Sequence, residues 1–431
     1  MEVNLINQSN TWQAWHRVLF RFLFAYIFLY CFSFPFFYIP GAHVVIHPIG
    51  SLLQDLSVWY GTNVWGYTNV PTEETGSGDT LLYWLLWATK LTLAILVTFI
   101  WSVIDRKRQA YPWLKKLLLT YTRYYLALIL LSYGLFKMVP TQFEEPSARM
   151  LVQMYGESSP MGLLWNFMGY STAYQIFGGV AEVLGAVLLL FRRTTLLGAL
   201  ILVGVMANVV ILNYCFDVPV KLASTHYLLF SMGLAFVYGK PVTNLLLLNR
   251  ATEPMDQTPL FEKKRWFWGT QITKLLLVGF VFYSMLSAAL AQKSYTDTLK
   301  HTSAMGGVFD VIDFSRKSSS DSIARNYRYY WHRMVLDKFR PDKLVVQQIN
   351  GTKVRYQIAW DTVAKQVTGY VPEDSLNRIE LHYESTTKSK LKWKGVWRDD
   401  SVRMITKRFE TDSMLLKTRG FRWVNPIPFN R

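Results

Sequence analysis

The pattern of hydrophobic and polar positions divides the chain into two parts. In the first part, long apolar segments alternate with polar ones, and a helix needs about 20 apolar residues to cross a bilayer. Seven segments approach this length: 16–38, 81–103, 118–138, 173–191, 194–214, 222–239 and 266–291. The first is too long for the apolar core of a signal peptide, so we expect it to remain as a signal anchor. The pattern predicts a polytopic α-helical membrane protein with about seven transmembrane helices.

The long apolar segments end near Gly306, and short segments rich in β-branched and aromatic residues follow. Residues 344–349 and 352–358 flank Asn350-Gly351, a strong hairpin signal. Further strands are expected at 378–383, 391–397 and 402–409, with a second turn at 398–400. The C-terminal part is therefore predicted to form a small antiparallel β domain, either an open sheet or a barrel.

Lysines recur at every second position of one of these segments, at Lys388, Lys390, Lys392 and Lys394. On an extended strand they project from one face. Two interpretations remain open: a solvated outer face, or contact with anionic lipid headgroups. The segment contains no phosphate-binding glycine loop and no nucleic-acid-binding motif, so nucleic acid is not expected as a partner.

The composition agrees with a chain that is part membrane protein and part soluble domain. Of 431 residues, 51% are hydrophobic, the mean hydropathy is +0.14, and the formal charge is +17. Cys31 and Cys215 are the only cysteines, with no CxxC pair and no cluster at metal-binding spacing, so no metal site is predicted. Whether the two cysteines form a disulfide stays open.

The distribution of Lys and Arg between alternate loops predicts the orientation, because basic residues are retained on the cytoplasmic side. Residues 39–80 contain neither Lys nor Arg, 139–172 contain only Arg149, and 215–221 contain only Lys221. The other loops are basic, with Arg106, Lys107, Arg108, Lys115, Lys116, Arg192, Arg193, Lys240, Arg250, Lys263, Lys264 and Arg265. We therefore expect a cytoplasmic N-terminus and an extracytoplasmic C-terminal domain, in a bacterial inner membrane.

Ionisable groups inside membrane spans are costly and mark candidate functional sites. Glu182 lies well inside the fourth span, and Gln175, seven residues earlier, shares its helical face. Gly178 and Gly185 flank Glu182 and allow close helix contact. By depth alone, Glu182 is expected to meet other polar residues in the outer half of the bilayer: Tyr133, Lys137, Asn208, Asn213 and His226.

Two further points about this group stay open. Lys90, in the second span, lies at nearly the depth of Glu182, so a Lys90–Glu182 ion pair is one alternative. The other alternative is that Glu182 has only a structural role between packed helices, in which it is either hydrogen-bonded to a neighbouring helix or protonated.

The stretch YGLFKMVPTQF at 133–143, followed by AEVLGAVLL at 181–189, resembles the DoxX family of membrane proteins. The segments at 155–165 and 421–426 resemble a longer bacterial subgroup. The resemblance implies four domains: two N-terminal transmembrane helices with an outer loop in 1–117, a DoxX-like four-helix bundle in 118–240, a cytoplasmic loop and seventh helix in 241–299, and the extracytoplasmic β domain in 300–431.

The DoxX family is implicated in electron transfer from thiosulfate to quinone and in redox-associated membrane complexes. The resemblance implies a quinone as the ligand, with Glu182 and His226 as catalytic groups that exchange protons. Tyr133, Lys137, Gln175, Asn208 and Asn213 would be ligand-binding. The electron donor would be a redox partner subunit or a small molecule. Two alternatives remain: a non-enzymatic binder or transporter of lipid or another small molecule, and a membrane anchor for a partner protein.

Overall fold

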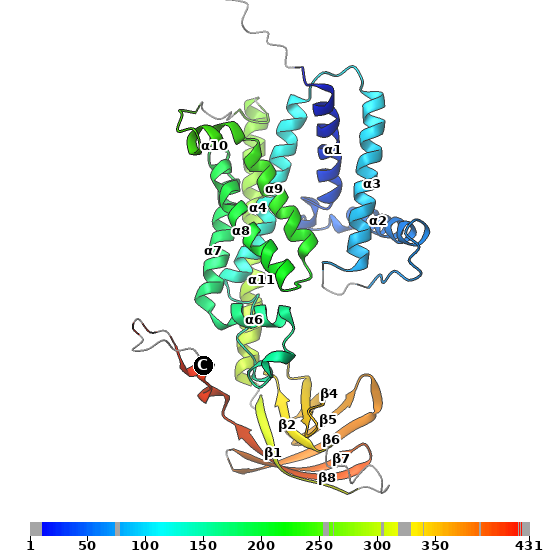
Figure 1. The fold of residues 1–431 in the computed structure, drawn as a ribbon, viewed down its shortest axis with the longest axis vertical. Coiled ribbons are helices and arrows are strands. Elements are labelled where there is room, and N and C mark those ends of the chain that lie inside the picture. Colours follow the sequence, from blue (N-terminus) through cyan, green and yellow to red (C-terminus); the bar gives the residue numbers. More distant parts are fainter. Residues whose placement is uncertain are drawn as a thin grey trace, which may run out of the picture. The chain divides into compact units, whose positions relative to one another are not determined.

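The computed structural model divides the chain into a helical unit and a β unit (Figure 1). It describes residues 11–73, 78–252, 258–261, 263–302, 306–317, 329–338, 340–387, 389–420, 422 and 424. The helical unit comprises residues 1–143, 160–164 and 171–290. The β unit comprises residues 144–159, 165–170 and 291–431.

The helical unit is built around α4 (Pro112–Met138), which contacts α1 (Ala14–Tyr30), α7 (Thr172–Leu189) and α9 (Lys221–Phe236). The other long helices are α2 (His43–Asn63), α3 (Leu81–Ile104), α8 (Thr195–Cys215) and α11 (Lys264–Thr302). Short helices in this unit are η1 (Phe36–Tyr38), η3 (Arg192–Thr194) and α10 (Gly239–Leu246). The β unit contains the short helices α5 (Ala148–Leu151), η2 (Tyr155–Glu157), η5 (Thr411–Ser413) and α12 (Leu415–Thr418), and α6 (Pro160–Tyr170) is divided between the two units.

Within the described residues, four helices are long and apolar enough to cross a membrane: α3, α7, Arg192–Cys215 and Lys264–Leu299. A fifth is added if α9 and α10, which are bent by 71° at their junction, form one broken span. Helix α1 has only 17 residues, and α4 carries Arg123 and Lys137 among several tyrosines. Helices that are long and apolar enough to span a membrane are thus confirmed, whereas seven spans stay a prediction.

Helix α2 corrects the expectation that residues 39–80 form a loop. It runs across α3 rather than along it (Figure 1) and buries Ser57 and Gly61. Its sequence contains Pro48, Asp55 and two histidines, so it lacks the continuous apolar run by which the other helices were predicted. A helix of this kind is not predicted when only continuous apolar segments are considered.

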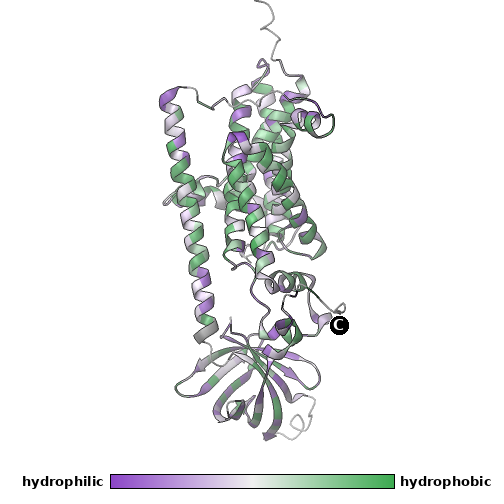
Figure 2. Cartoon of the chain, turned by 90° about the vertical axis from the view of Figure 1, so that its left-hand side faces the viewer, coloured by the Kyte–Doolittle hydropathy of each residue, from purple (hydrophilic) through white to green (hydrophobic). Residues whose placement is uncertain are grey.

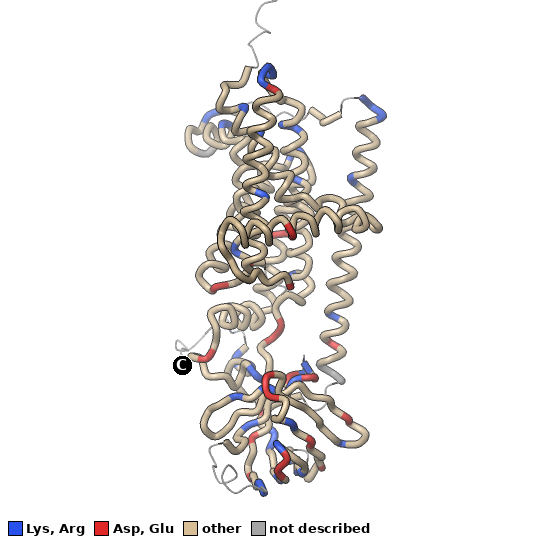
Figure 3. The backbone as a smooth tube through the Cα atoms, turned by 90° about the vertical axis from the view of Figure 1, so that its right-hand side faces the viewer, with Lys and Arg blue, Asp and Glu red and all other residues tan. Residues whose placement is uncertain are grey.

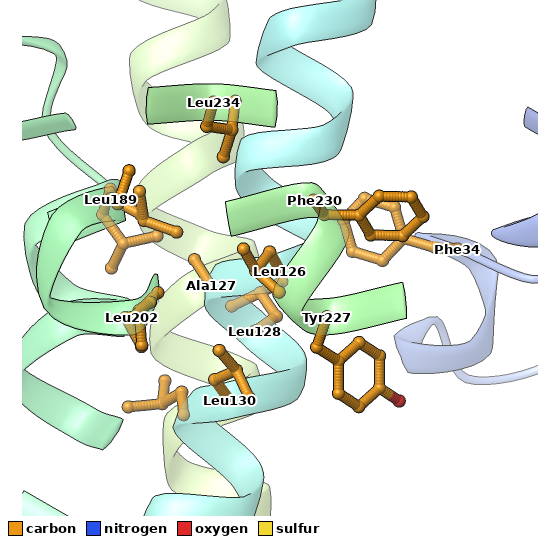
Figure 4. Packing of buried hydrophobic residues seen from close by; sticks show 14 of the residues in the cluster. Phe34, Leu126, Ala127, Leu128, Leu130, Leu189, Leu202, Tyr227, Phe230 and Leu234 are labelled. Atoms are coloured by element: carbon orange, nitrogen blue, oxygen red, sulfur yellow. The ribbon is translucent and has the colours of Figure 1, made fainter. Parts of the chain in front are cut away.

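The core of the helical unit lies where α4, α7, α8 and α9 meet. Leu126 of α4, Leu189 of α7, Leu202 of α8 and Phe230 of α9 belong to one buried cluster (Figure 4). The helices of this unit are hydrophobic along most of their length, whereas the β unit alternates between hydrophilic and hydrophobic residues along its strands (Figure 2). Many large apolar side chains on the helices are exposed, among them Phe99 and Phe177. An apolar surface over an apolar core is typical of helices surrounded by lipid.

Close contact between α4 and α7 depends on glycine. A Cβ atom on Gly134 would lie 2.9 Å from the Gly179 carbonyl oxygen, and one on Gly179 would lie 2.7 Å from the Gly134 carbonyl oxygen. Gly185 makes the corresponding contact with Leu202 of α8. Gly178, expected from sequence to serve this purpose, has no neighbour within 4 Å among the described residues, so Gly179 takes that role.

The β unit contains a closed antiparallel barrel in which each strand pairs with the next and β1 pairs with β8. The strands are β1 (Gly307–Lys317), β2 (Trp331–Leu336), β3 (Lys343–Gln348), β4 (Lys353–Asp361), β5 (Gln366–Val371), β6 (Asp374–Thr387), β7 (Lys390–Trp397) and β8 (Asp400–Phe409). Aromatic side chains fill much of its core. Trp397 donates from Nε1 to the Tyr356 hydroxyl and to Asn377 Oδ1, both at 3.0 Å.

The predicted strands are confirmed, and the barrel alternative is the one observed. Strands β3 and β4 form the expected hairpin, with Gly351 at φ 86°, a conformation that favours glycine. The second turn also forms, with positive φ at Arg398 and Asp399. Strands β1, β2 and β5 were not predicted. Lys390, Lys392 and Lys394 are exposed on β7, and Lys388 lies outside the described residues.

Candidate functional site

An ion pair between Lys137 and Glu182 lies inside the helical unit. The Lys137 ammonium donates to Glu182 Oε1 across the α4–α7 contact, where Gly134 and Gly179 bring the two helices together. Only 8% of Lys137 and 2% of Glu182 is exposed. The other carboxylate oxygen, Oε2, is buried and has no hydrogen-bond partner among the described residues.

This arrangement settles which lysine neutralises Glu182. Lys90 lies elsewhere: its ammonium is 3.4 Å from the Tyr30 carbonyl oxygen and 5.9 Å from the centre of the Tyr30 ring. The alternative of a Lys90–Glu182 pair is therefore wrong. Depth favoured Lys90, which was expected at nearly the level of Glu182, but the rotation of the helices decides which lysine faces the glutamate.

Gln175 shares the buried face of Glu182, as its spacing predicts. Only 1% of it is exposed. With its amide oriented to satisfy both of its polar atoms, the nitrogen donates to the Phe143 carbonyl oxygen at 3.2 Å and the oxygen accepts from the Phe143 N–H at 3.1 Å. Gln175 therefore holds the segment that follows α4 against α7, two helical turns from Glu182.

His226 belongs to a second polar cluster, formed by α1, α3 and α9. Its Nδ1 lies 2.7 Å from the Leu222 carbonyl oxygen and is therefore protonated. Its Nε2 accepts from the Tyr26 hydroxyl at 2.5 Å, and Trp87 Nε1 donates to that hydroxyl at 2.8 Å. The chain from Trp87 through Tyr26 to His226 satisfies a neutral imidazole at both nitrogens.

Aromatic residues connect the two clusters. The His226 ring stacks on Tyr30 with centroids 4.0 Å apart, and the Tyr133 and Tyr227 rings lie 6.2 Å apart. Tyr133 lies one helical turn before Lys137 on α4. Sequence reasoning identified Tyr133 and His226 but missed Tyr26 and Trp87, because aromatic residues in a span usually indicate packing or the membrane interface.

The two asparagines behave differently from each other. Asn213 is buried and donates from Nδ2 to the Ser224 hydroxyl at 3.0 Å, which joins the end of α8 to α9. Asn208 is exposed on α8, so the expectation that it faces the interior of the bundle is wrong. The buried side of α8 runs instead through Leu202, Met206 and Asn213.

The described residues contain both cysteines of the chain. Cys31 is buried and Cys215 is exposed, and neither forms a disulfide. The described residues contain no cluster of three or more His, Cys, Asp or Glu side chains that is suited to a metal ion.

Taken together, the described residues define a protein with apolar helices long enough to cross a membrane, a buried ion pair and a separate β-barrel domain. Over 141 residues the chain is 36% identical to the uncharacterized protein YwoB of Bacillus subtilis (strain 168). The aligned residues make up 33% of this chain and 87% of YwoB. The chain therefore belongs to the same family as YwoB. No family model and no solved structure matches it.

Proposed function

We propose that this chain is a seven-span membrane protein of the DoxX type that binds a quinone or a related small apolar carbonyl compound beside Lys137 and Glu182. The basic loops would lie in the cytoplasm and the barrel outside it, which places the ion pair in the outer half of the membrane. Support comes from the apolar helices, the distribution of Lys and Arg, and the motifs around Lys137 and Glu182.

The observation that carries the proposal is the unpartnered Oε2 of Glu182. A buried charged oxygen without a hydrogen bond is costly, and native structures seldom keep one without a reason. Here the oxygen belongs to a carboxylate whose other oxygen is bound by Lys137. A ligand hydroxyl would supply the missing donor.

The pair also suits both redox forms of a quinone. Of the three N–H groups of the Lys137 ammonium, one donates to Glu182 and others remain to donate to a carbonyl oxygen. Glu182 Oε2 accepts from the hydroxyl of the reduced form and can take up its proton. When bound, the quinone supplies the electron-transfer chemistry, and a redox partner would supply the electrons.

His226 has a positioning role in this proposal. Both ring nitrogens are engaged, so the imidazole is not free to take a proton without breaking the hydrogen bond from Tyr26. Its contribution is to hold α1 and α3 against α9 and to fix the Tyr30 ring. Gln175 and Asn213 likewise hold helices in place.

The test is mass spectrometry of small molecules retained by the protein after purification in mild detergent. Wild type is compared with Glu182→Gln, and Asn208→Ala serves as the control because it removes a polar side chain that faces outward from the same part of the helical unit. We expect wild type and Asn208→Ala to retain a quinone and folded Glu182→Gln to lose it.

Other outcomes discriminate between the alternatives. A phospholipid retained in place of a quinone, and lost in Glu182→Gln, would favour a lipid binder or transporter. A stable co-purifying protein with no small molecule would favour a membrane anchor. Equal retention of a quinone by all three proteins would contradict the proposed site.

A further inference from the structure

A second candidate site lies at another part of the helical unit, where α4 and α8 begin and α9 joins α10. A cleft of about 570 Å³ opens there, within the size range of small-molecule sites. It is separate from the Lys137–Glu182 pair, because Lys137 lies at the opposite end of α4 from the residues that line the cleft. The proposed function makes no use of it.

The described lining of the cleft is basic. Five basic residues line it: Lys115, Lys116, Arg123, Arg192 and Lys240. No Asp or Glu is present among the described lining residues. Lys and Arg gather toward this end of the helical unit (Figure 3). The arrangement favours an anion.

Two helix N-termini add to this field. Pro112 of α4 and Lys240 of α10 each lie in the first turn of their helix, and both line the cleft. The first turn of a helix presents N–H groups without intrahelical partners and carries a partial positive charge, which makes it suited to phosphate.

Arg123 provides independent evidence that a ligand belongs here. Only 7% of it is exposed, and its Nε is buried without a hydrogen-bond partner among the described residues. One terminal nitrogen donates to Thr195 Oγ1 at 3.3 Å, a long hydrogen bond to a neutral group. No described carboxylate forms an ion pair with it. A buried guanidinium without a counter-ion is costly.

We propose that this cleft binds a phosphate monoester. A dianion with three terminal oxygens can accept hydrogen bonds from several donors at once, and a guanidinium binds phosphate in a two-pronged geometry. Leu119, Leu234 and Val237 line the same cleft and offer an apolar surface to the rest of the molecule. The ligand is either the headgroup of an anionic lipid or a soluble phosphate ester.

The experiment uses the full-length protein in nanodiscs. Glycerol phosphate is titrated by calorimetry into nanodiscs of phosphatidylcholine, and phosphatidic acid retained from mixed nanodiscs is measured by native mass spectrometry. Saturable glycerol phosphate binding identifies a soluble ligand, and preferential retention of phosphatidic acid alone identifies a lipid headgroup. Either result supports the proposal, provided that the variants below respond as expected.

A matched pair of variants separates the cleft from general surface charge. Arg192 lines the cleft, whereas its neighbour Arg193 is exposed and does not. We expect Arg192→Gln and Arg123→Gln to weaken binding by about tenfold or more and Arg193→Gln to leave it nearly unchanged. Arg192→Gln keeps the test valid if the buried Arg123 variant fails to fold.

Two results would overturn the proposal. One is an equal loss of affinity in Arg192→Gln and Arg193→Gln, which would indicate general electrostatic attraction. The other is the absence of saturable binding to either probe.

Discussion

The helical unit and the β unit each contain a buried ion pair, and the two pairs differ in one respect. In the barrel, Arg316 donates from Nε to Asp400 at 2.6 Å, and its guanidinium lies 4.4 Å from the centre of the Trp397 ring. Among the described residues, every fully buried side-chain nitrogen or oxygen of Arg316 and Asp400 has a hydrogen-bond partner. In the helical unit, Glu182 keeps Oε2 unpartnered among the described residues. The barrel pair is complete as a structural contact, whereas the helical pair has a position for a further donor.

The surfaces of the two units differ as well. Phe177 on α7 is 69% exposed, whereas Trp393 in the barrel is 2% exposed. An exposed phenylalanine is stable against lipid but not against water, and a barrel in water must place its aromatic residues inside. The exposure of aromatic side chains therefore indicates different surroundings for the two units.

Breaking the ion pairs should have the largest effect. Lys137→Met and Arg316→Met each leave a buried carboxylate without its partner, and we expect each to lower the free energy of unfolding by about 3 to 5 kcal/mol. The double variants K137M/E182Q and R316M/D400N remove both charges and should recover most of that loss. Thermal unfolding in detergent measures all four.

The comparison of the two ion pairs is contradicted if only one of the double variants recovers the lost free energy of unfolding. They should differ only in ligand retention, which K137M/E182Q loses and R316M/D400N keeps. A loss of ligand in both would show that retention merely follows stability.

Aromatic substitutions should have an intermediate effect in the barrel and almost none on the helical surface. Trp393 donates from Nε1 to Thr406 Oγ1 at 2.9 Å, and both residues are buried. Trp393→Phe removes this donor, so we expect a loss of about 1 to 3 kcal/mol. Phe177→Leu should change stability by less than about 0.5 kcal/mol. Unfolding monitored in nanodiscs distinguishes the two; a large effect of Phe177→Leu would mean that α7 packs against protein at this position.

The smallest expected effect concerns an ion pair on the surface of the β unit. The Lys353 ammonium donates to the Glu157 carboxylate and lowers the pKa of Glu157 below its ordinary value of 4.5. A lowered pKa stabilises the folded state above the unfolded value, and this contribution is lost as the pH falls through the folded value. Lys353→Gln should therefore lower the midpoint of thermal unfolding slightly at neutral pH and have no effect in strong acid. A difference that persists in acid would show that Lys353 acts through packing.

Part of the fold could be predicted from the sequence, because local patterns determine it. The Asn350-Gly351 turn specifies its own hairpin, and the apolar runs of α3, α7, α8 and α11 are long enough to be recognised. Closure of the barrel could not be predicted, since β1 pairs with β8, which is distant in sequence. Strand β1 also contains Asp310 and Asp313, which obscure its alternation.

The sequence identified Glu182 as a candidate site residue, but it did not show which lysine forms the ion pair with it. Glu182 stands out as a carboxylate in an apolar helix, and the levels of Lys90 and Lys137 follow from counting residues. The choice of Lys137 depends on the rotation of α4, which the Gly134–Gly179 contact determines. The hydrogen bonds of Tyr26 and Trp87 to the His226 cluster join three separate helices, and no local pattern contains that information.

The most direct measurement is the affinity of a short-chain quinone for wild type and for K137M/E182Q in nanodiscs, after the folding of the double variant has been verified. Losing hydrogen bonds to charged groups costs about 1.5 to 3 kcal/mol each, so we predict saturable binding by wild type and at least about tenfold weaker binding by the variant. Equal affinity in the two proteins, or no saturable binding by wild type, would contradict the assignment of Lys137 and Glu182 as a ligand site.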